Sequence, residues 1–232
     1  MDKEAKTKYG TPIKHGTKYS YFNRLRATIR KAYGDGYISN PKMLKIKAFE
    51  EKESQREYLT FEELQALANS DCKFPILKKA FLFSCLTGLR WGDIHKLRWS
   101  QIRDERNIHR IIFTQQKTKD LEYMYISKQA RDLIGKKPKG DERVFVGLQY
   151  STAITTELLR WCMKAGINKH ITFHCARHTA ATLLLDAGAD LYSVMKILGH
   201  KDIRTTQIYA RIMDKKLLET AELLPELQFE LD

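Results

Sequence analysis

The stretch Thr172–Ala210, TFHCARHTAATLLLDAGADLYSVMKILGHKDIRTTQIYA, holds histidines, an arginine and a tyrosine in segments of helical periodicity. Gly188 and Gly199 interrupt this periodicity where helices commonly end, which predicts three consecutive helices. The predicted helices run from about Cys175 to Ala187, from a cap at Asp190 to Gly199, and from a cap at Asp202 through Tyr209. We expect these helices and turns to gather the polar side chains into one pocket.

The segments before this stretch predict further helices and one small sheet. Thr60-Phe61-Glu62-Glu63 fits a capping box, in which the first and last side chains satisfy free amides of the first turn. Gly88 follows an apolar helical pattern that starts near Phe74, at a position where a left-handed residue is wanted. Helices are also predicted up to 97, over 127–134 and over 151–165, and strands over 110–113, 121–126 and 144–146. The fold class is therefore mainly α with a small antiparallel β-sheet (α+β).

A separate amphipathic helix is predicted from Tyr19 to Tyr33, after a mobile lead that ends at about Gly16. Its polar face carries the basic residues Arg24, Arg26, Arg30 and Lys31. A single helix cannot bury its own apolar stripe, so this segment either docks on the main domain or belongs to a larger helical unit. Charged residues from 42 to 56 are typical of a linker. We expect a boundary that separates residues 1–52 from a main domain at 53–232.

Length and composition place the chain among ordinary globular proteins. The 232 residues are 43% hydrophobic, and no apolar run approaches the roughly 20 residues that cross a bilayer. The first residues contain no apolar core of a secretory signal, which predicts a soluble, cytoplasmic protein with no membrane partner. The four cysteines are scattered at Cys72, Cys85, Cys162 and Cys175, which favours free thiols in a reducing compartment.

The net charge of +13 points to a polyanionic partner. Thirteen basic and five acidic residues lie between Met1 and Lys52, so this short segment carries +8 of the total. Lysine and arginine side chains release counterions from phosphates, and an excess this uneven favours nucleic acid. A basic, soluble protein whose tail has no specific role is the alternative.

His174, Arg177 and His178 lie on one side of a predicted helix and admit two interpretations. Two histidines four residues apart resemble half of a zinc site, but the glutamate of the zinc hydrolase motif is absent from HCARH. An arginine between the histidines disfavours a divalent cation. Its planar fork matches phosphate oxygens instead.

His200 and Tyr209 complete the set of candidate residues. His200 follows Gly199, and free amides at the start of the next predicted helix would attract phosphate. A phenol with a pKa near 10 is a poor nucleophile at neutral pH. It can attack a phosphodiester only where cations neutralise the phosphate and another group takes the proton. Alternatively, Tyr209 is a core tyrosine whose hydroxyl finds a partner.

Several separated motifs together resemble the tyrosine recombinase (phage integrase) family. Within this family they resemble most the integrases of conjugative transposons and prophages. They are the segment from His174 to Thr179, the Leu198-Gly199-His200 triplet, Tyr209, the box Leu86–Ile94 around Arg90, and Gln116-Lys117-Thr118 in the loop between the predicted strands. The resemblance extends from about Leu59 to Leu224.

This resemblance implies a recombinase that cleaves and rejoins double-stranded DNA at attachment sites through a 3′-phosphotyrosyl intermediate. It implies no cofactor, neither ATP nor a metal. The implied catalytic residues are Arg90, Lys117, His174, Arg177, His200 and Tyr209, with Asp93 and His178 in support. Lys119 competes with Lys117 for the lysine role. The implied assembly is a homotetramer on DNA, aided by accessory DNA-bending proteins and associated with the nucleoid.

The ends of the chain also have counterparts in the family. Residues 1–52 resemble the last part of the core-binding clamp, as expected for a piece of a longer integrase or for a short one. The predicted helix at 214–224 resembles the segment that neighbouring subunits exchange, unless it folds back on its own domain. Three other functions remain open: a type IB topoisomerase, a catalytically silent DNA-binding paralogue, and a zinc hydrolase.

Overall fold

The computed structural model describes residues 6–7, 10–47, 56–114, 121–140, 142–200 and 202–209. The chain forms two compact units, Met1–Gln55 and Arg56–Asp232. No helix among the described residues is both long enough and apolar enough to cross a membrane.

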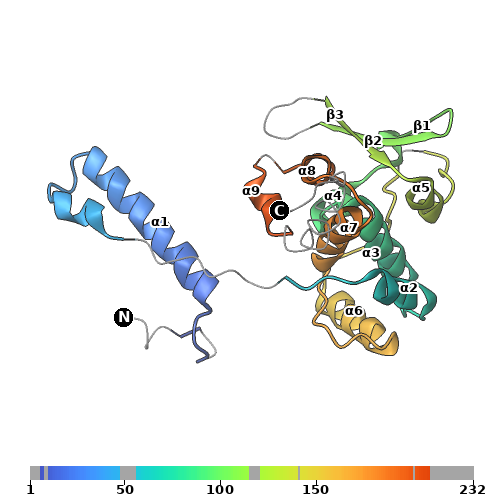
Figure 1. The fold of residues 1–232 in the computed structure, drawn as a ribbon, viewed down its shortest axis with the longest axis horizontal. Helices are drawn as coiled ribbons and strands as arrows, with labels where there is room; N and C mark the ends of the chain where they lie inside the picture. The colour runs from blue at the N-terminus through green and yellow to red at the C-terminus, as the bar shows by residue number, and fades with distance from the viewer. Residues whose placement is uncertain are drawn as a thin grey trace, which may run out of the picture. The chain divides into compact units, whose positions relative to one another are not determined.

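The first unit consists of helix α1 (His15–Gly34) followed by a short 3₁₀ helix (Pro41–Lys45), as Figure 1 shows in blue. The helix begins at His15, four residues before the predicted start at Tyr19. The predicted lead, which ended at about Gly16, therefore overlaps the first turn of the helix. Lys14 stands at the N-cap without a side-chain cap, which explains why the sequence carried no start signal. No described residue of either helix is buried, and the apolar side chains of Tyr21 and Leu25 are largely exposed.

The second unit is mainly helical, with one three-stranded antiparallel sheet, as predicted. Its helices are α2 (Phe61–Asn69), α3 (Pro75–Thr87), α4 (Trp91–Lys96), α5 (Lys128–Ile134), α6 (Thr152–Lys164), α7 (Cys175–Asp186), α8 (Leu191–Leu198) and α9 (Arg204–Gln207), with a 3₁₀ turn at Trp99–Gln101. Its strands are β1 (Ile102–Glu105), β2 (Ile108–Thr114) and β3 (Leu121–Ile126).

Several predicted helix ends are confirmed because their signals are local. Thr60 and Glu63 form the expected capping box on α2. Ser127 caps α5, and Asp190 caps α8 through the backbone N–H of Ser193. The last helix differs from the prediction, because α9 is only four residues long and ends two residues before Tyr209.

The sheet corrects one predicted strand. The order β1–β2–β3 is a meander, in which Ile102 pairs with Ile111 and Ile111 with Met124. The third strand is β1 and not residues 144–146, which form a turn. The residue before this turn, Arg143, forms an isolated antiparallel β-bridge with Arg98.

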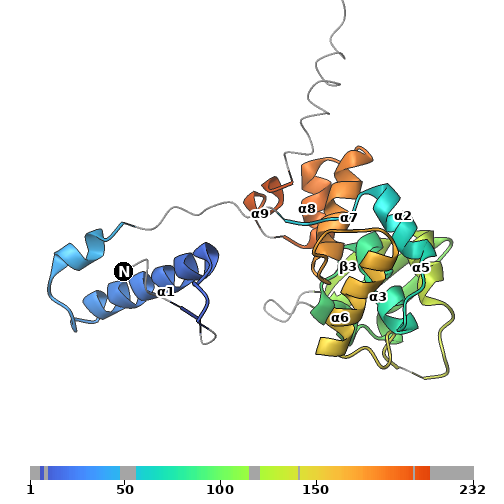
Figure 2. The same cartoon turned by 90° about the horizontal axis from the view of Figure 1, so that it is seen from below.

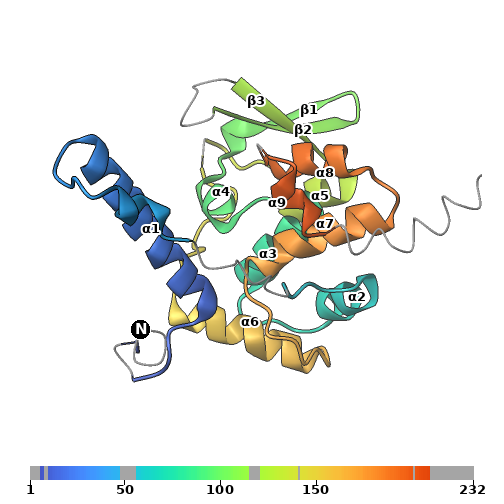
Figure 3. The same ribbon diagram turned by 60° about the vertical axis from the view of Figure 1, so that its left-hand side comes forward.

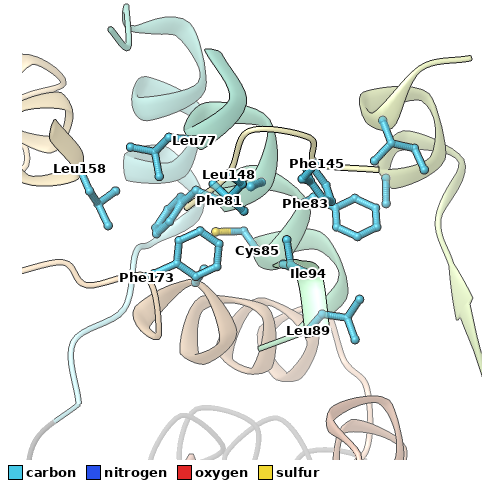
Figure 4. Packing of buried hydrophobic residues seen from close by; sticks show 14 of the residues in the cluster. Leu77, Phe81, Phe83, Cys85, Leu89, Ile94, Phe145, Leu148, Leu158 and Phe173 are labelled. Carbon is cyan, nitrogen blue, oxygen red and sulfur yellow. The ribbon is translucent and has the colours of Figure 1, made fainter. Parts of the chain in front are cut away.

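Helix α3 is the centre of the core, and α7 lies beside it (Figures 1 and 3). Phe81 of α3 makes edge-on ring contacts with Trp161 and Phe173, at centroid separations of 5.9 and 5.6 Å. Figure 4 shows Cys85 among the same apolar side chains. All four cysteines are free thiols, as predicted, and only Cys72 is not fully buried. Burial raises the pKa of the Cys162 thiol to about 12, so this sulfur stays protonated and apolar.

Candidate functional site

The end of α3 builds one wall of the site. Gly88 stops the helix with φ +71°, and its backbone conformation turns the chain toward α4. A Cβ atom at this glycine would lie 2.7 Å from Cδ2 of Leu198, so α3 and α8 approach closely only because no side chain intervenes. Arg90 then stands at the N-cap of α4, exposed to solvent, and its backbone N–H donates to the Asp93 carboxylate over 3.3 Å.

Arg177 joins the ends of two helices. Its Nη1 donates to the carbonyl oxygen of Gly88 over 2.7 Å, and its Nη2 donates to the carbonyl of Leu198. These two carbonyls belong to the C-terminal ends of α3 and α8, where backbone acceptors are left without helical partners. The guanidinium is therefore buried at the junction of α3, α7 and α8, the helices grouped in Figure 3.

The two arginines leave the site electropositive. Burial and the neighbouring charge of Arg90 lower the pKa of Arg177 to about 10, which still leaves it charged at neutral pH. Like charges held this close are unfavourable unless an anion lies near them. The arrangement therefore suits an oxyanion better than a cation.

Tyr209 lies in this charged surrounding with its hydroxyl hydrogen-bonded to a histidine. Nδ1 of His178 is 2.6 Å from the Tyr209 hydroxyl oxygen, and both side chains are buried. Burial raises the pKa of Tyr209, against the opposing influence of Arg177, Arg56 and Arg90, so the resting phenol keeps its proton. His174 does not make this contact: its ring packs edge-on against His178, with 4.7 Å between centroids.

His178 is a neutral imidazole in the resting site. Burial, followed by the charges of His174, Arg56, Arg177 and His200, lowers the pKa of His178 to about 4. Burial likewise lowers the pKa of His174, with Arg177 as the next cause. Neutral rings can accept as well as donate hydrogen bonds, unlike imidazolium.

His200 directly follows the C-terminal end of α8, as predicted. Its backbone N–H donates to the carbonyl of Met195 over 3.0 Å, after Gly199 in the left-handed conformation. The next helix, where free amides were expected, has Ile203 and not the predicted Asp202 at its N-cap, and the backbone N–H of Arg204 donates to the Asp202 carboxylate over 2.9 Å. Nδ1 of His200 lies 2.9 Å from the hydroxyl of Thr206, which fixes the ring, and burial beside Arg177 and Arg90 lowers the pKa of His200 to about 4.

Arg56 is a site residue that the sequence reasoning missed. Its charge acts on His174, His178, His200 and Tyr209. The segment that carries it is held against α7, because the backbone N–H of Leu59 donates to Oγ1 of Thr179 over 2.9 Å. Arg56 belongs to no motif, and its position three residues before a buried leucine was the available signal.

The structure thus brings five predicted residues into one electrostatic cluster, and one lies outside the described residues. Arg90, His174, Arg177, His200 and Tyr209 are joined by the hydrogen bonds and charge interactions above. Lys117 and its competitor Lys119 fall in the undescribed segment 115–120 between β2 and β3, and the predicted helix at 214–224 is also outside. Within the described part of the chain, no three His, Cys, Asp or Glu side chains converge as metal ligands would.

A buried phenol beside clustered arginines and neutral histidines defines a class of site that receives an oxyanion next to a nucleophile. Comparison with known proteins agrees with this class. The model of the phage integrase family matches residues 57–216. The tyrosine recombinase XerD of Lacticaseibacillus casei is 31% identical over 219 residues, covering 84% of this chain and 73% of the relative. XerC of Corynebacterium glutamicum is 33% identical over 144 residues, or 57% of this chain and 46% of the relative.

Solved structures share the fold. The catalytic domain of bacteriophage HP1 integrase superposes with a TM-score of 0.53 at 26% identity, over 74% of this chain and 96% of that one. A lambda integrase dimer bound to a COC′ core site gives a TM-score of 0.60 at 22% identity, over 77% and 70% of the two chains. The chain belongs to the phage integrase family and is a tyrosine-type site-specific recombinase.

Proposed function

We propose that this recombinase cleaves and rejoins double-stranded DNA with Tyr209 as nucleophile, through a 3′-phosphotyrosyl intermediate. The observation that carries the proposal is the burial of the Tyr209 hydroxyl among Arg177, Arg90 and the histidines. The relatives are named tyrosine recombinases, and one structural neighbour, the Tn1549 transposon integrase, is in complex with circular intermediate DNA.

Arg90 and Arg177 bind the non-bridging oxygens of the scissile phosphate. The exposed Arg90 meets the incoming DNA, while Arg177 is already fixed by the carbonyls of Gly88 and Leu198. A guanidinium held in place before the reaction needs no reorganisation as charge develops on the phosphate. Removal of one such donor costs roughly 10²- to 10³-fold in rate. His200, with its Nδ1 held by Thr206, presents Nε2 as a further donor to the same phosphate.

The chemical step exchanges one phosphate ester for another. The phenol oxygen of Tyr209 attacks phosphorus, the bond from phosphorus to the 5′ oxygen breaks, and the phenol proton leaves with the help of His174. Lys117 protonates the departing 5′ oxygen, which would otherwise leave as an alkoxide. The phosphotyrosyl bond conserves the energy of the phosphodiester, so rejoining requires neither ATP nor a metal ion.

The remaining parts of the chain serve DNA binding and assembly. Residues 1–52, with the basic face of α1, act as a partial core-binding clamp. The segment 214–224 exchanges between neighbouring subunits of a homotetramer that holds two attachment sites. The lopsided charge of the first 52 residues supports the clamp, since phosphate neutralisation dominates DNA affinity. Accessory DNA-bending proteins assist the assembly, which is associated with the nucleoid.

The test is a covalent capture experiment on DNA of unspecified sequence. The protein is incubated with a pool of duplexes nicked at one fixed position and randomised around it, so that cleavage releases a short fragment and traps the intermediate. Denaturing electrophoresis should reveal a protein–DNA adduct, and sequencing of the trapped DNA should give the preferred site.

Tyr209→Phe should abolish this adduct, because phenylalanine retains the ring and lacks the nucleophilic oxygen. Tyr192→Phe is the matched control: Tyr192 is an exposed tyrosine on α8, and the variant should form as much adduct as the wild type. An adduct that persists in Tyr209→Phe, or the absence of any adduct from the wild type, would refute the proposed nucleophile. Equal adduct formation in the presence of a chelator is expected.

A further inference from the structure

The contact between His178 and Tyr209 has no part in the chemistry assigned so far. Nδ1 of His178 and the Tyr209 hydroxyl oxygen are 2.6 Å apart, and the exposed fractions of the two residues are 5% each. The ring centroids are 5.7 Å apart at an interplanar angle of 53°, so the contact is a hydrogen bond between ring substituents and not a stacking contact.

The place of Tyr209 in the chain makes this hydrogen bond important. Helix α9 ends at Gln207, and the backbone N–H of Tyr209 donates to the carbonyl of Thr206 over 3.0 Å in a turn. Tyr209 belongs to a buried apolar cluster with residues of α7 and α8, namely Ala181, Leu185, Val194 and Leu198. Apolar packing holds the ring but does not orient its hydroxyl group. Within the described residues, the hydrogen bond of that hydroxyl is to His178.

Two consecutive residues of α7, Arg177 and His178, contact different parts of the site. Arg177 reaches toward α3 and α8, where it holds two backbone carbonyls. His178, the next residue on α7, reaches toward Tyr209. A rigid helix therefore sets the position of the nucleophile relative to the guanidinium that receives the phosphate.

The protonation of the pair decides between two roles for His178. Burial lowers the pKa of His178 to about 4, and burial raises the pKa of Tyr209 above its ordinary value. Transfer of the phenol proton to this imidazole is therefore strongly uphill, and both groups remain neutral. His178 does not remove the proton in the resting site, and its Nδ1 is an acceptor for the phenol in the tautomer that carries the proton on Nε2.

We propose that His178 is a positioning residue, which accepts a hydrogen bond from the Tyr209 hydroxyl through Nδ1 and thereby holds the phenol beside Arg177 for attack. The proposal rests on the proposed function of Tyr209. It adds an element that His174 does not supply, since His174 touches the edge of the His178 ring. A misplacement of about 1 Å at a reacting atom can cost on the order of 10²-fold in rate.

Two substitutions test the role in the covalent capture assay. His178→Leu keeps an apolar side chain in the buried position but removes the acceptor, and the rate of adduct formation should fall about 10- to 100-fold. His178→Asn places a carbonyl oxygen close to the position of Nδ1 and cannot take a proton at neutral pH. It should restore most of the rate that the leucine variant loses.

The pH dependence separates positioning from proton transfer. Between pH 6 and 8 the rate should have the same profile in His178→Asn as in the wild type, because a neutral acceptor does not titrate in that range. His170→Asn is the control, since His170 is an exposed histidine just before the site and its replacement should change neither rate nor profile. Thermal melting of each variant verifies that the fold is retained.

Three results would overturn the proposal. A leucine variant that forms adduct as fast as the wild type, or faster, would make the bond a resting contact that attack must break. An asparagine variant as slow as the leucine variant, with an altered pH profile, would make His178 the proton acceptor. If both variants form adduct slowly and also have lower melting temperatures than the wild type, the role of His178 is structural. Absence of adduct from the wild type would instead refute the proposed function itself.

Discussion

Arg177 is both a structural and a chemical residue, and the two duties depend on the same guanidinium. It donates to the carbonyls of Gly88 and Leu198, so it holds the C-terminal ends of α3 and α8 together. It is also the buried cation toward which a phosphate would be drawn. A planar fork can serve both duties at once because it has five N–H donors in fixed directions.

Replacement of Arg177 by lysine should therefore impair stability as well as activity. An ammonium group cannot span the two carbonyls, and hydrogen bonds to charged groups contribute about 1.5–3 kcal/mol each. We expect Arg177→Lys to lower the free energy of unfolding in urea by about 1.5–3 kcal/mol and to eliminate the adduct. Arg90→Lys is the comparison, because Arg90 is exposed: it should reduce adduct formation with little loss of stability. Equal stability losses for the two variants would contradict this division.

The neutral histidines of the site should make stability fall in mild acid. The pKa of His178 is lowered to about 4 by burial, whereas the unfolded chain has an ordinary histidine with a pKa near 6.5. Between these values the unfolded state binds a proton that the folded state does not bind. The free energy of unfolding is therefore fully retained above pH 6.5 and falls as the pH drops toward 4, by about 1.4 kcal/mol per pH unit for one proton.

Urea denaturation at pH 7, 6 and 5 measures this dependence. In His178→Asn the slope between pH 6 and 5 should be shallower by about one proton. His200, with its pKa also lowered to about 4 by burial, continues to contribute in that variant. A stability that does not change between pH 7 and 5 would show that the buried histidines do not resist protonation.

At the scale of elements, the junction of α3 with α8 depends on one glycine. Gly88 has φ +71°, and an added Cβ would lie 2.7 Å from the Leu198 side chain. Gly88→Ala should cost about 1–2 kcal/mol for the left-handed backbone and about 1–3 kcal/mol for the clash. Gly166→Ala provides the control, because Gly166 has φ +76° with no atom within 4 Å of the added Cβ. Urea denaturation should give the smaller loss for Gly166→Ala, and equal losses would mean that α8 moves away freely.

The predicted elements that the structure confirms are those whose signals are local. The capping box at Thr60 and the left-handed turn at Gly88 follow from the residues themselves. Strand β1 was missed because it is short and only Ile102 of its residues is buried. The segment 144–146 has the apolar character of a strand, but Phe145 is buried from a turn against Phe83.

The site was predictable in its members but not in its contacts. The motifs identified Arg90, Arg177 and Tyr209, which the structure gathers in one cluster. The hydrogen bond that Tyr209 makes to His178 in the resting site was not predicted, whereas the proton-transfer role that the sequence assigned to His174 stays a prediction. Helical periodicity puts both histidines on one side of α7, and the approach of the turn after α9 decides which one is reached. Figure 2 shows α7, α8 and α9 as neighbours, an arrangement that no local signal encodes.

At the scale of the whole molecule, charge is distributed unevenly between the two units. Residues 1–55 contain thirteen basic and six acidic residues, a net charge of +7 in under a quarter of the chain. The described part of this unit buries no side chain of α1, so its arginines are available to a partner. The second unit carries the remaining +6 on more than three times as many residues. Affinity for DNA should therefore depend on the first unit more than its size suggests.

Neutralising three arginines of α1 tests this distribution in the full chain. Each phosphate contact adds about 0.9 to the slope of log affinity against log salt concentration. If all three arginines contact phosphates, replacing Arg24, Arg26 and Arg30 by glutamine should reduce the slope by about 2.7. The matched control replaces Lys136, Lys137 and Lys139, three exposed lysines of the second unit, and changes the net charge equally. Fluorescence anisotropy with a labelled duplex between 50 and roughly 200 mM salt measures both slopes. If the two triple variants lose the same slope, general charge rather than the α1 face draws the protein to DNA.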